Sequence, residues 1–438
     1  MSINNKKVFE LKLINQKNNF EVALSGSKSF TNRALILTAI AEGKSILINA
    51  SKGDDTENMI KALRNFGLEI IKSNDNLLIN NQGLKPYRGS IDIGPSGTTI
   101  RFLTSFCSGV ENSLVELRGS ERMHQRPIKD LVQALQSVGV EIKYLDSDGF
   151  PPIEIKGRKK QTSYSIKVKG DISSQFLTSI MLSASLLASY VEIFVEGELV
   201  SKSYVDMTLF TLKQFGVNVI KEGYNYFLIA KTEPLAGVYN MDGDASGAGY
   251  FWSLGLASGC EAKVLNLDIK SPQGDLGLLE IFKSMGAEVV AGNNEAIKWI
   301  SVKAKEELKP VTCDLTLLPD SAQTLAVLCS MVNGESLITG LGTLKHKETD
   351  RLQALQNELK KINIKTEITD NSIKVFGGTI KIPQEGVIID TYEDHRMAMS
   401  FAILAAKYQG IKIKDPNVVT KSFPDFWEKL KDCGVDIK

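Results

Sequence analysis

Basic residues gather near six segments that are rich in small and hydroxyl side chains. These segments read GSKSFTNRALIL, GPSGTTIRFLTSF, DISSQFLTSIML, GDASGAGYFWSLG, LPDSAQTLAVL and YEDHRMAMSFAIL. A helix that begins in such a segment presents unpaired N–H groups and about half a positive charge, which suits an anion. The basic residues near these starts and the turns are Lys28, Arg33, Arg101, Arg122, Arg126, Lys202, Lys345, Lys347, Arg351, Arg396 and Lys421. Together they predict two subsites for polyanionic small molecules.

Acidic side chains stand among these cations. Asp320 lies in LPDSAQT, and Glu348 and Asp350 lie in KHKETDR. A carboxylate beside lysines and an arginine is most often half of an ion pair. At a crowded anion site it also has the chemistry of a general acid or base, and both interpretations stay open at this point.

The elements that must position these residues follow from a repeated phrase. It occurs as LRNFGLEI, LQSVGVEI, LKQFGVNV, FKSMGAEV, LKKINIKT and LKDCGVDI. In each copy an amphipathic helix should end, a residue in the left-handed conformation should follow, and a strand should begin. Those residues are Gly67, Gly139, Gly216, Gly286, Asn363 and Gly434, which recur about every 70 residues.

The hydroxyl-rich segments recur with the same period and precede helices that are apolar on nearly every side. Equivalent positions in the six segments are Thr31, Thr98, Ser174, Ser246, Ser321 and His395. Such a helix should be buried. Each repeat is then a β-α-β-α-β-β unit, and the fold class is α/β with two domains of three repeats around buried helices. We expect one domain at residues 21–239 and the other at 1–20 plus 240–438.

Composition excludes several classes of protein. The 438 residues carry a net charge of +1, so no general attraction to nucleic acid or to an anionic membrane is expected. The sequence has no export signal and no membrane span, which predicts a cytoplasmic location. Five scattered cysteines and three histidines predict neither a disulfide framework nor a metal site. GSKS lacks the P-loop glycine, so we expect no ATP site there, and GPSGTT lacks the dinucleotide-binding pattern.

The chain resembles a known family along essentially its whole length. The matching motifs, in order, are GSKSFTNRA, SGTTIR, ERMHQRPI, SSQFLTS, SKSYVDMT, GDASGAGYF, PDSAQT, KETDRL, DHRMAM and TKSFPDF. They are similar to signatures of 5-enolpyruvylshikimate-3-phosphate synthase (3-phosphoshikimate 1-carboxyvinyltransferase), an enolpyruvyl transferase family. The resemblance implies an inverse α/β architecture of two domains, with the active site in the cleft between them.

The resemblance also implies the reaction. The enolpyruvyl group of phosphoenolpyruvate would pass to the 5-hydroxyl of shikimate 3-phosphate, and phosphate would leave from a tetrahedral intermediate. The step belongs to the shikimate pathway, which leads to chorismate and the aromatic amino acids. It needs no cofactor, and the expected partners are the two small-molecule substrates of a monomeric enzyme.

Site residues carried over from the family fall into three groups. Catalysis would use Asp320 as the acceptor of the 5-hydroxyl proton, with Glu348 or Lys28 handling the methylene proton of phosphoenolpyruvate. Shikimate 3-phosphate would be bound by Lys28, Ser29, Arg33, Ser173, Ser174, Gln175, Ser201, Tyr204, Asp320 and Lys347. Phosphoenolpyruvate would be bound by Lys28, Gly97, Arg122, Gln175, Arg351, Arg396 and Lys421.

The sequence departs from the family pattern at three positions. Pro95 replaces the usual Asn and Phe102 replaces a frequent Pro, and both flank Gly97. Sensitivity to glyphosate, the family's inhibitor at the phosphoenolpyruvate position, therefore does not follow from the resemblance. Thr343 replaces a common Asn, which weakens one implied substrate contact.

Two other functions remain as alternatives. The related transferase that acts on UDP-N-acetylglucosamine shares the fold, but it expects Lys-Asn near the first helix and a reactive loop cysteine. This chain has SKSFTNR and ERMHQRP instead. A catalytically silent protein that binds a phosphorylated ligand is the second alternative, and Asp320 and Glu348 argue against it.

Overall fold

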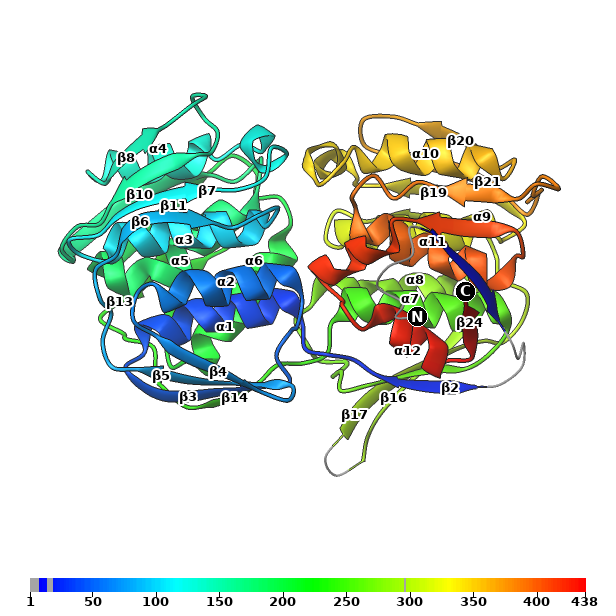
Figure 1. The fold of residues 1–438 in the computed structure, drawn as a ribbon, viewed down its shortest axis with the longest axis horizontal. Helices are drawn as coiled ribbons and strands as arrows, with labels where there is room; N and C mark the ends of the chain where they lie inside the picture. Colours follow the sequence, from blue (N-terminus) through cyan, green and yellow to red (C-terminus); the bar gives the residue numbers. More distant parts are fainter. Residues whose placement is uncertain (1–7, 14–18, 295–296) are drawn as a thin grey trace. The chain divides into compact units, whose positions relative to one another are not determined.

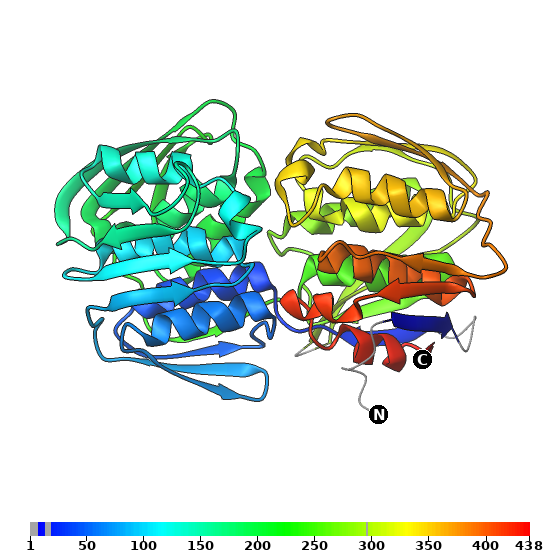
Figure 2. The same cartoon turned by 45° about the horizontal axis from the view of Figure 1, so that its top comes forward.

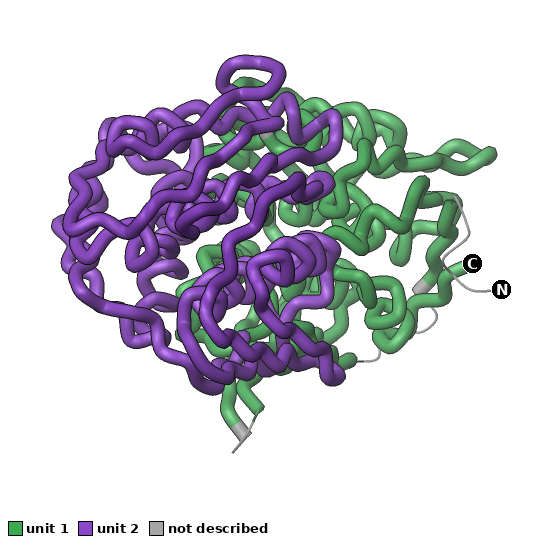
Figure 3. Tube along the Cα trace, turned by 60° about the vertical axis from the view of Figure 1, so that its left-hand side comes forward, with its two compact units in different colours: residues 1–25, 242–438 green, residues 26–241 purple. Residues whose placement is uncertain are grey.

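The computed structural model describes residues 8–13, 19–294 and 297–438. The chain divides into two compact units: unit 1 takes Met1–Ser25 and Asp242–Lys438, and unit 2 takes Gly26–Met241 (Figure 3). The boundaries expected from the sequence, 20/21 and 239/240, fall a few residues before these points. Residues 1–7 and 14–18, which the sequence assigns to the second domain, lie outside the described residues.

Unit 2 contains its elements in the expected repeating order (Figure 1). Its strands are β3 (Gly43–Ile48), β4 (Glu69–Ser73), β5 (Asn76–Asn81), β6 (Arg88–Asp92), β7 (Leu114–Arg118), β8 (Glu141–Tyr144), β9 (Ile153–Lys156), β10 (Gln161–Lys169), β11 (Ala188–Glu196), β12 (Val219–Glu222), β13 (Tyr226–Ala230) and β14 (Val238–Asn240). Its helices are α1 (Lys28–Ile40), α2 (Asp54–Arg64), α3 (Gly97–Gly109), α4 (Lys129–Ser137), α5 (Ser174–Leu187) and α6 (Lys202–Gln214), with the short 3₁₀ helix η2 (Met123–Gln125).

Unit 1 repeats the same plan. Its strands are β1 (Val8–Leu13), β2 (Phe20–Ala23), β15 (Ala262–Leu265), β16 (Ala287–Asn294), β17 (Ile297–Ala304), β18 (Thr312–Asp314), β19 (Gly334–Thr339), β20 (Lys365–Ile368), β21 (Ile373–Gly377), β22 (Val387–Ile389), β23 (Ile411–Lys414) and β24 (Val435–Ile437). Its helices are α7 (Ala245–Ser258), α8 (Leu278–Ser284), α9 (Ala322–Ser330), α10 (Arg351–Lys361), α11 (His395–Lys407) and α12 (Phe426–Asp432). Its 3₁₀ helices are η3 (Gly274–Gly277), η4 (Pro319–Ser321), η5 (Gly342–His346) and η6 (Pro416–Lys421).

In the described parts of the chain the strands form six four-stranded sheets, one for each repeat. The sheet order β6-β7-β9-β8 is typical: the first pair is parallel and the other two pairs are antiparallel. This is the β-α-β-α-β-β repeat that the sequence predicts, and the two-domain α/β prediction is confirmed.

Three sheets complete themselves with a strand from far along the chain. β14 pairs with β3 in unit 2, whereas β2 pairs with β15 in unit 1. β1 lies between β23 and β24 and closes the last sheet of unit 1. Because β2 belongs to unit 1 and β14 to unit 2, the chain passes between the units just after each of these strands.

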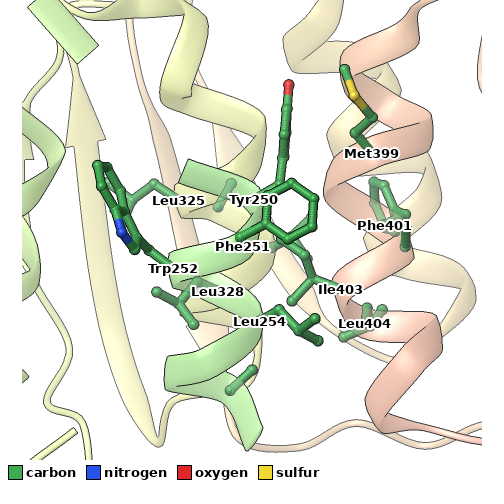
Figure 4. Close-up of a cluster of buried hydrophobic side chains, with 14 of the residues drawn as sticks. Tyr250, Phe251, Trp252, Leu254, Leu325, Leu328, Met399, Phe401, Ile403 and Leu404 are labelled. Atoms are coloured by element: carbon green, nitrogen blue, oxygen red, sulfur yellow. The ribbon is translucent and has the colours of Figure 1, made fainter. Parts of the chain in front are cut away.

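The apolar helices form the centre of each unit. α1, α3 and α5 lie side by side in unit 2, as α7, α9 and α11 do in unit 1, and the amphipathic helices lie further out (Figures 1 and 2). Figure 4 shows Tyr250, Phe251 and Trp252 of α7 packing among side chains of α9 and α11. These helices are buried around their whole circumference, as their composition predicts.

The six capping residues that the sequence singles out all adopt the predicted left-handed conformation. The five glycines have φ between 79° and 104°, and Asn363 has φ 65°. Each follows an amphipathic helix, so the repeated phrase reflects the need for a left-handed residue where the helix ends. In the part of the chain that the structure describes, no helix combines the length and the apolar character needed to span a bilayer.

Candidate active site

The starts of the buried helices of unit 2 are joined by side chains. Ser96 caps α3 by accepting the N–H of Thr99, and Ser173 caps α5 by accepting the N–H of Gln175. Thr98 and Ser174, which mark equivalent positions in the two segments, lie in the first turns. Ser173 therefore uses its hydroxyl to cap the helix itself.

Lys28 opens α1 and contacts α2. Its Nζ lies 2.8 Å from Oδ2 of Asp55, whose side chain is 3% exposed. The main-chain oxygen of Asp55 also accepts a hydrogen bond from the Thr99 hydroxyl of α3, at 3.1 Å. One residue that the sequence reasoning missed, Asp55, thus links the starts of three helices.

Gln175 joins the starts of α3 and α5. Its Oε1 accepts a hydrogen bond from Arg101 Nη1 at 2.6 Å, and its Nε2 donates to the Thr98 hydroxyl at 3.3 Å. Arg101 also donates to the carbonyl of Pro127 at 3.2 Å. Gln175 is therefore placed at the helix starts, as the sequence predicts.

The guanidinium of Arg126 lies against Gly97, whereas the resemblance names Arg122 for the site. A Cβ at Gly97 would lie 2.5 Å from Nη1 of Arg126, so any larger residue would require this guanidinium to shift. Arg126 is buried, whereas Arg122 is half-buried and hydrogen-bonds Gln125 at 3.1 Å. Of the two arginines of ERMHQRP, Arg126 supplies the atoms nearest to Gly97 at the start of α3.

Arg33 is buried, and its guanidinium makes hydrogen bonds to other residues of unit 2. Its guanidinium donates to the carbonyls of Ser29 and Tyr204 and to the Thr208 hydroxyl, at 2.8 to 2.9 Å. Burial lowers the pKa of Arg33 to about 10. Arg33 therefore ties α1 to the first turn of α6. Ser201 occupies the N-cap position of α6 with a left-handed φ of 53° and makes no side-chain capping hydrogen bond.

Arg351 is the centre of the charged residues of unit 1. Its Nε lies 2.7 Å from Asp394, its Nη1 lies 3.0 Å from Asp320, and its Nη2 lies 3.0 Å from Glu348. Burial lowers the pKa of Arg351, but Asp394, Glu348 and Asp320 raise it by more, so the net shift is upward. The guanidinium is a permanent cation that orients three carboxylates.

Asp320 receives two further cations. Arg396 Nη2 lies 2.9 Å from Oδ2, and Lys347 Nζ lies 3.4 Å from Oδ1. Glu348 is likewise bound on its other oxygen by Lys421, at 2.5 Å. Every predicted site residue of unit 1 therefore lies in one connected network.

Behind this network lies a second buried acid, Asp275. Its carboxylate accepts hydrogen bonds from the hydroxyls of Ser246 at the start of α7 and of Ser321 at the start of α9, the latter at 2.7 Å. Burial raises the pKa of Asp275, and burial also raises the pKa of the nearby Tyr250 to about 12. Burial therefore disfavours the charged form of both groups.

Three acids were not found from the sequence: Asp55, Asp275 and Asp394. Asp394 caps α11 by accepting the N–H of Arg396, so an acid directly before His-Arg at a helix start could have been recognised. Asp55 and Asp275 meet their partners only through the tertiary fold. Conversely, two of the lysines near the predicted helix starts have other partners: Lys345 pairs with exposed Asp370, and Lys202 lies 3.6 Å from Glu198.

The arrangement has a clear chemical capacity. We call the two sets of residues the unit 2 cluster (Lys28, Asp55, Gly97, Arg101, Arg126 and Gln175) and the unit 1 cluster (Asp320, Glu348, Lys347, Arg351, Asp394, Arg396 and Lys421). Each combines helix N-termini with cations, which bind phosphate and carboxylate groups. The unit 1 cluster adds carboxylates held by cations, which can move protons.

Comparison with known proteins identifies the family. Residues 14–430 match the family model described as EPSP synthase (3-phosphoshikimate 1-carboxyvinyltransferase). The 3-phosphoshikimate 1-carboxyvinyltransferase of Vibrio campbellii is 38% identical over 94% of this chain and 96% of its own length. The enzyme of that name from Photobacterium profundum is 37% identical over 95% of this chain and 96% of its own length.

Solved structures agree on the fold. EPSP synthase from Acinetobacter baumannii gives a TM-score of 0.82 at 24% identity, covering 99% of this chain and 100% of that chain. The enolpyruvyl transferase NikO from Streptomyces tendae gives 0.74 at 14% identity, covering 99% of each chain. The matched family model and the curated relatives show that the chain belongs to the EPSP synthase (3-phosphoshikimate 1-carboxyvinyltransferase) family.

Proposed function

We propose that the protein transfers the enolpyruvyl group of phosphoenolpyruvate to the 5-hydroxyl of shikimate 3-phosphate and releases phosphate. The observation that carries this proposal is the Asp320 carboxylate, which Arg351, Arg396 and Lys347 hold at the start of α9. A base fixed among cations is what proton removal beside two anionic substrates requires. Membership of the family supports the choice of substrates.

The proposed reaction has two steps, an addition and an elimination. In the addition, the 5-hydroxyl loses its proton to Asp320, its oxygen bonds to C2 of phosphoenolpyruvate, and C3 gains a proton. In the elimination, C3 loses a proton and the phosphate leaves with the oxygen that joined it to C2. Glu348 or Lys28 would transfer the proton at C3, and the intermediate is never bonded to the protein.

The binding residues divide as the sequence suggests, with one addition. Ser29, Arg33, Ser173, Ser174, Gln175, Ser201, Tyr204 and Lys347 would serve shikimate 3-phosphate, together with Lys28 and Asp320. Lys28, Gly97, Arg122, Gln175, Arg351, Arg396 and Lys421 would serve phosphoenolpyruvate. We add Arg126 to the second set because its guanidinium lies against Gly97.

The cations have a second role in the reaction. Lys28 pairs with Asp55 in the unit 2 cluster. In the unit 1 cluster the basic side chains pair with Asp320, Glu348 and Asp394, and all these ion pairs measure 2.5 to 3.4 Å. Substrate phosphates and carboxylates would compete for the basic side chains and gain charge-assisted hydrogen bonds. The same fixed charges would stabilise the additional charge of the intermediate without rearranging.

Phosphate release tests the proposal. Purified protein should release phosphate only when shikimate 3-phosphate and phosphoenolpyruvate are both present, with each omitted in turn as the control. UDP-N-acetylglucosamine is the competing acceptor. Release with the sugar nucleotide alone would replace the proposed acceptor, and no release with either acceptor would favour a binding protein.

A further inference from the structure

The segment that leads from β22 into α11 has an unusual backbone. Tyr392 and Glu393 have φ values of 54° and 55°, so two consecutive residues with side chains are left-handed. Such residues persist only where the surrounding structure holds them, and they concentrate at functional sites. The next residue is Asp394, the cap of α11, and Arg396 follows in its first turn.

A buried carboxylate on α10 holds this segment. Glu358 is fully buried, and its Oε1 accepts the Tyr392 hydroxyl at 2.6 Å. Its Oε2 accepts the N–H of Asp390 at 3.0 Å and lies 2.6 Å from Nζ of Lys361. Two points at the N-terminal side of the left-handed turn are therefore fixed: Asp390 before the turn and Tyr392 at its first position.

The same helix also holds the other end of the segment. Arg351 at the start of α10 binds Asp394 at 2.7 Å, and Glu358 lies two helical turns further along. Arg396, in turn, reaches Asp320 at 2.9 Å. Glu358 thus contacts Tyr392, the main chain leads from Tyr392 to Asp394, and Asp394 accepts the N–H of Arg396, which reaches Asp320.

We propose that Glu358 and Tyr392 are positioning residues, which set the orientation of Asp394 and Arg396 by holding the left-handed turn. This inference rests on the proposed function, because it concerns how Arg396 meets its substrate. Neither residue belongs to the charged cluster itself. If the pair only stabilised the fold, its loss would affect both substrates alike.

The kinetic test removes one hydroxyl. Tyr392→Phe deletes the hydrogen bond to Glu358, and we expect kcat/KM for phosphoenolpyruvate to fall about ten-fold while KM for shikimate 3-phosphate changes less than about two-fold. Adding Glu393→Gly should restore at least half of the loss, because glycine adopts a positive φ without strain. Tyr226→Phe is the matched control, because Tyr226 donates to Glu192 at 3.0 Å in unit 2, and it should leave both constants unchanged.

Three kinetic results would overturn the inference. These are an unchanged kcat/KM in Tyr392→Phe, a parallel loss for both substrates, and no recovery in the double variant. All assays should be made well below the melting temperature of each variant.

A crystal structure of Tyr392→Phe separates this inference from the function. Arg396 should then lie beyond hydrogen-bond distance of Asp320, and a contact still at 2.9 Å would contradict the positioning role. If the unaltered chain released no phosphate, the proposed function would fail, but this structural comparison would still decide the positioning role.

Discussion

At the scale of single residues, the unit 1 cluster depends on one buried cation. Arg351 is almost completely buried and contacts three carboxylates. A charge in this position is stable only because its partners are present. The acids gain fixed orientations in return, and one of them is the proposed base Asp320.

Loss of Arg351 should therefore affect stability as well as turnover. Arg351→Met leaves Asp394 and its neighbours without their shared cation, and we expect the free energy of unfolding to fall by about 3–5 kcal/mol. Arg118→Met is the control, because the Arg118–Glu116 pair is largely exposed and should contribute less than about 1 kcal/mol. Urea unfolding measures both, and equal losses would contradict the central role of Arg351.

Asp320 should matter for chemistry more than for folding. Asp320→Asn keeps the shape of the side chain but removes the base, so kcat should fall by at least about 100-fold. Asp314→Asn is the control in the same unit, where the carboxylate accepts the N–H of Thr316 at 2.9 Å in a turn. Steady-state phosphate release measures both variants, and normal turnover in Asp320→Asn would remove it as the base.

Single residues also show where sequence reasoning ends. Lys28, Arg351, Arg396 and Lys421 were predicted as site residues because their types and motifs indicate anion chemistry. Asp55 was not, because nothing in the local sequence shows that α2 brings it to Lys28. The choice between Arg122 and Arg126 likewise depends on which guanidinium faces Gly97, which only the fold determines.

At the scale of elements, the repeat and the two crossings of the chain near residues 20 and 240 were predictable, and the pairing of the strands at those crossings was not. Each surface helix ends at a left-handed residue, which leaves a local signature in the sequence. β2 and β14 carry no such signature, because each has three or four residues and pairs with a strand far along the chain. The pairing of β2 and β14 with distant strands therefore sets the exact boundaries of the two units, which the sequence places a few residues earlier.

The left-handed residues after the surface helices should contribute measurably to stability. Gly434 has φ 88°, and a Cβ there would meet nothing within 4 Å. Gly434→Ala should therefore cost about 1–2 kcal/mol through backbone conformation alone. Gly237→Ala is the control, since no left-handed φ is recorded there and its Cβ would meet Tyr239 at an ordinary 3.4 Å. Thermal unfolding compares them, and an unchanged melting temperature for Gly434→Ala would contradict the capping role.

At the scale of the whole molecule, the chain is almost neutral, and cations gather locally at the two clusters. The chain carries a net charge of +1, yet both clusters concentrate cations at helix starts. A neutral protein of this kind should select anions by geometry and not by overall attraction. Selectivity among anions is thus a property of the clusters.

Ligand-dependent stability checks this selectivity. Shikimate 3-phosphate should raise the melting temperature, because a ligand at about 100 times its Kd adds about 2.7 kcal/mol to the folded state. ATP at the same concentration is the control and should give no comparable rise. Equal rises with both anions, measured by differential scanning calorimetry, would indicate nonspecific anion binding.

The most direct test of the central claim follows the oxygen between C2 and phosphorus. The protein should be incubated with shikimate 3-phosphate and phosphoenolpyruvate labelled with ¹⁸O at this bridging position, and both products analysed by mass spectrometry. Addition and elimination predict that the label leaves in the released phosphate while an equal amount of the enolpyruvyl ether forms. Label retained in pyruvate, with no ether, would show hydrolysis at phosphorus and would contradict the account.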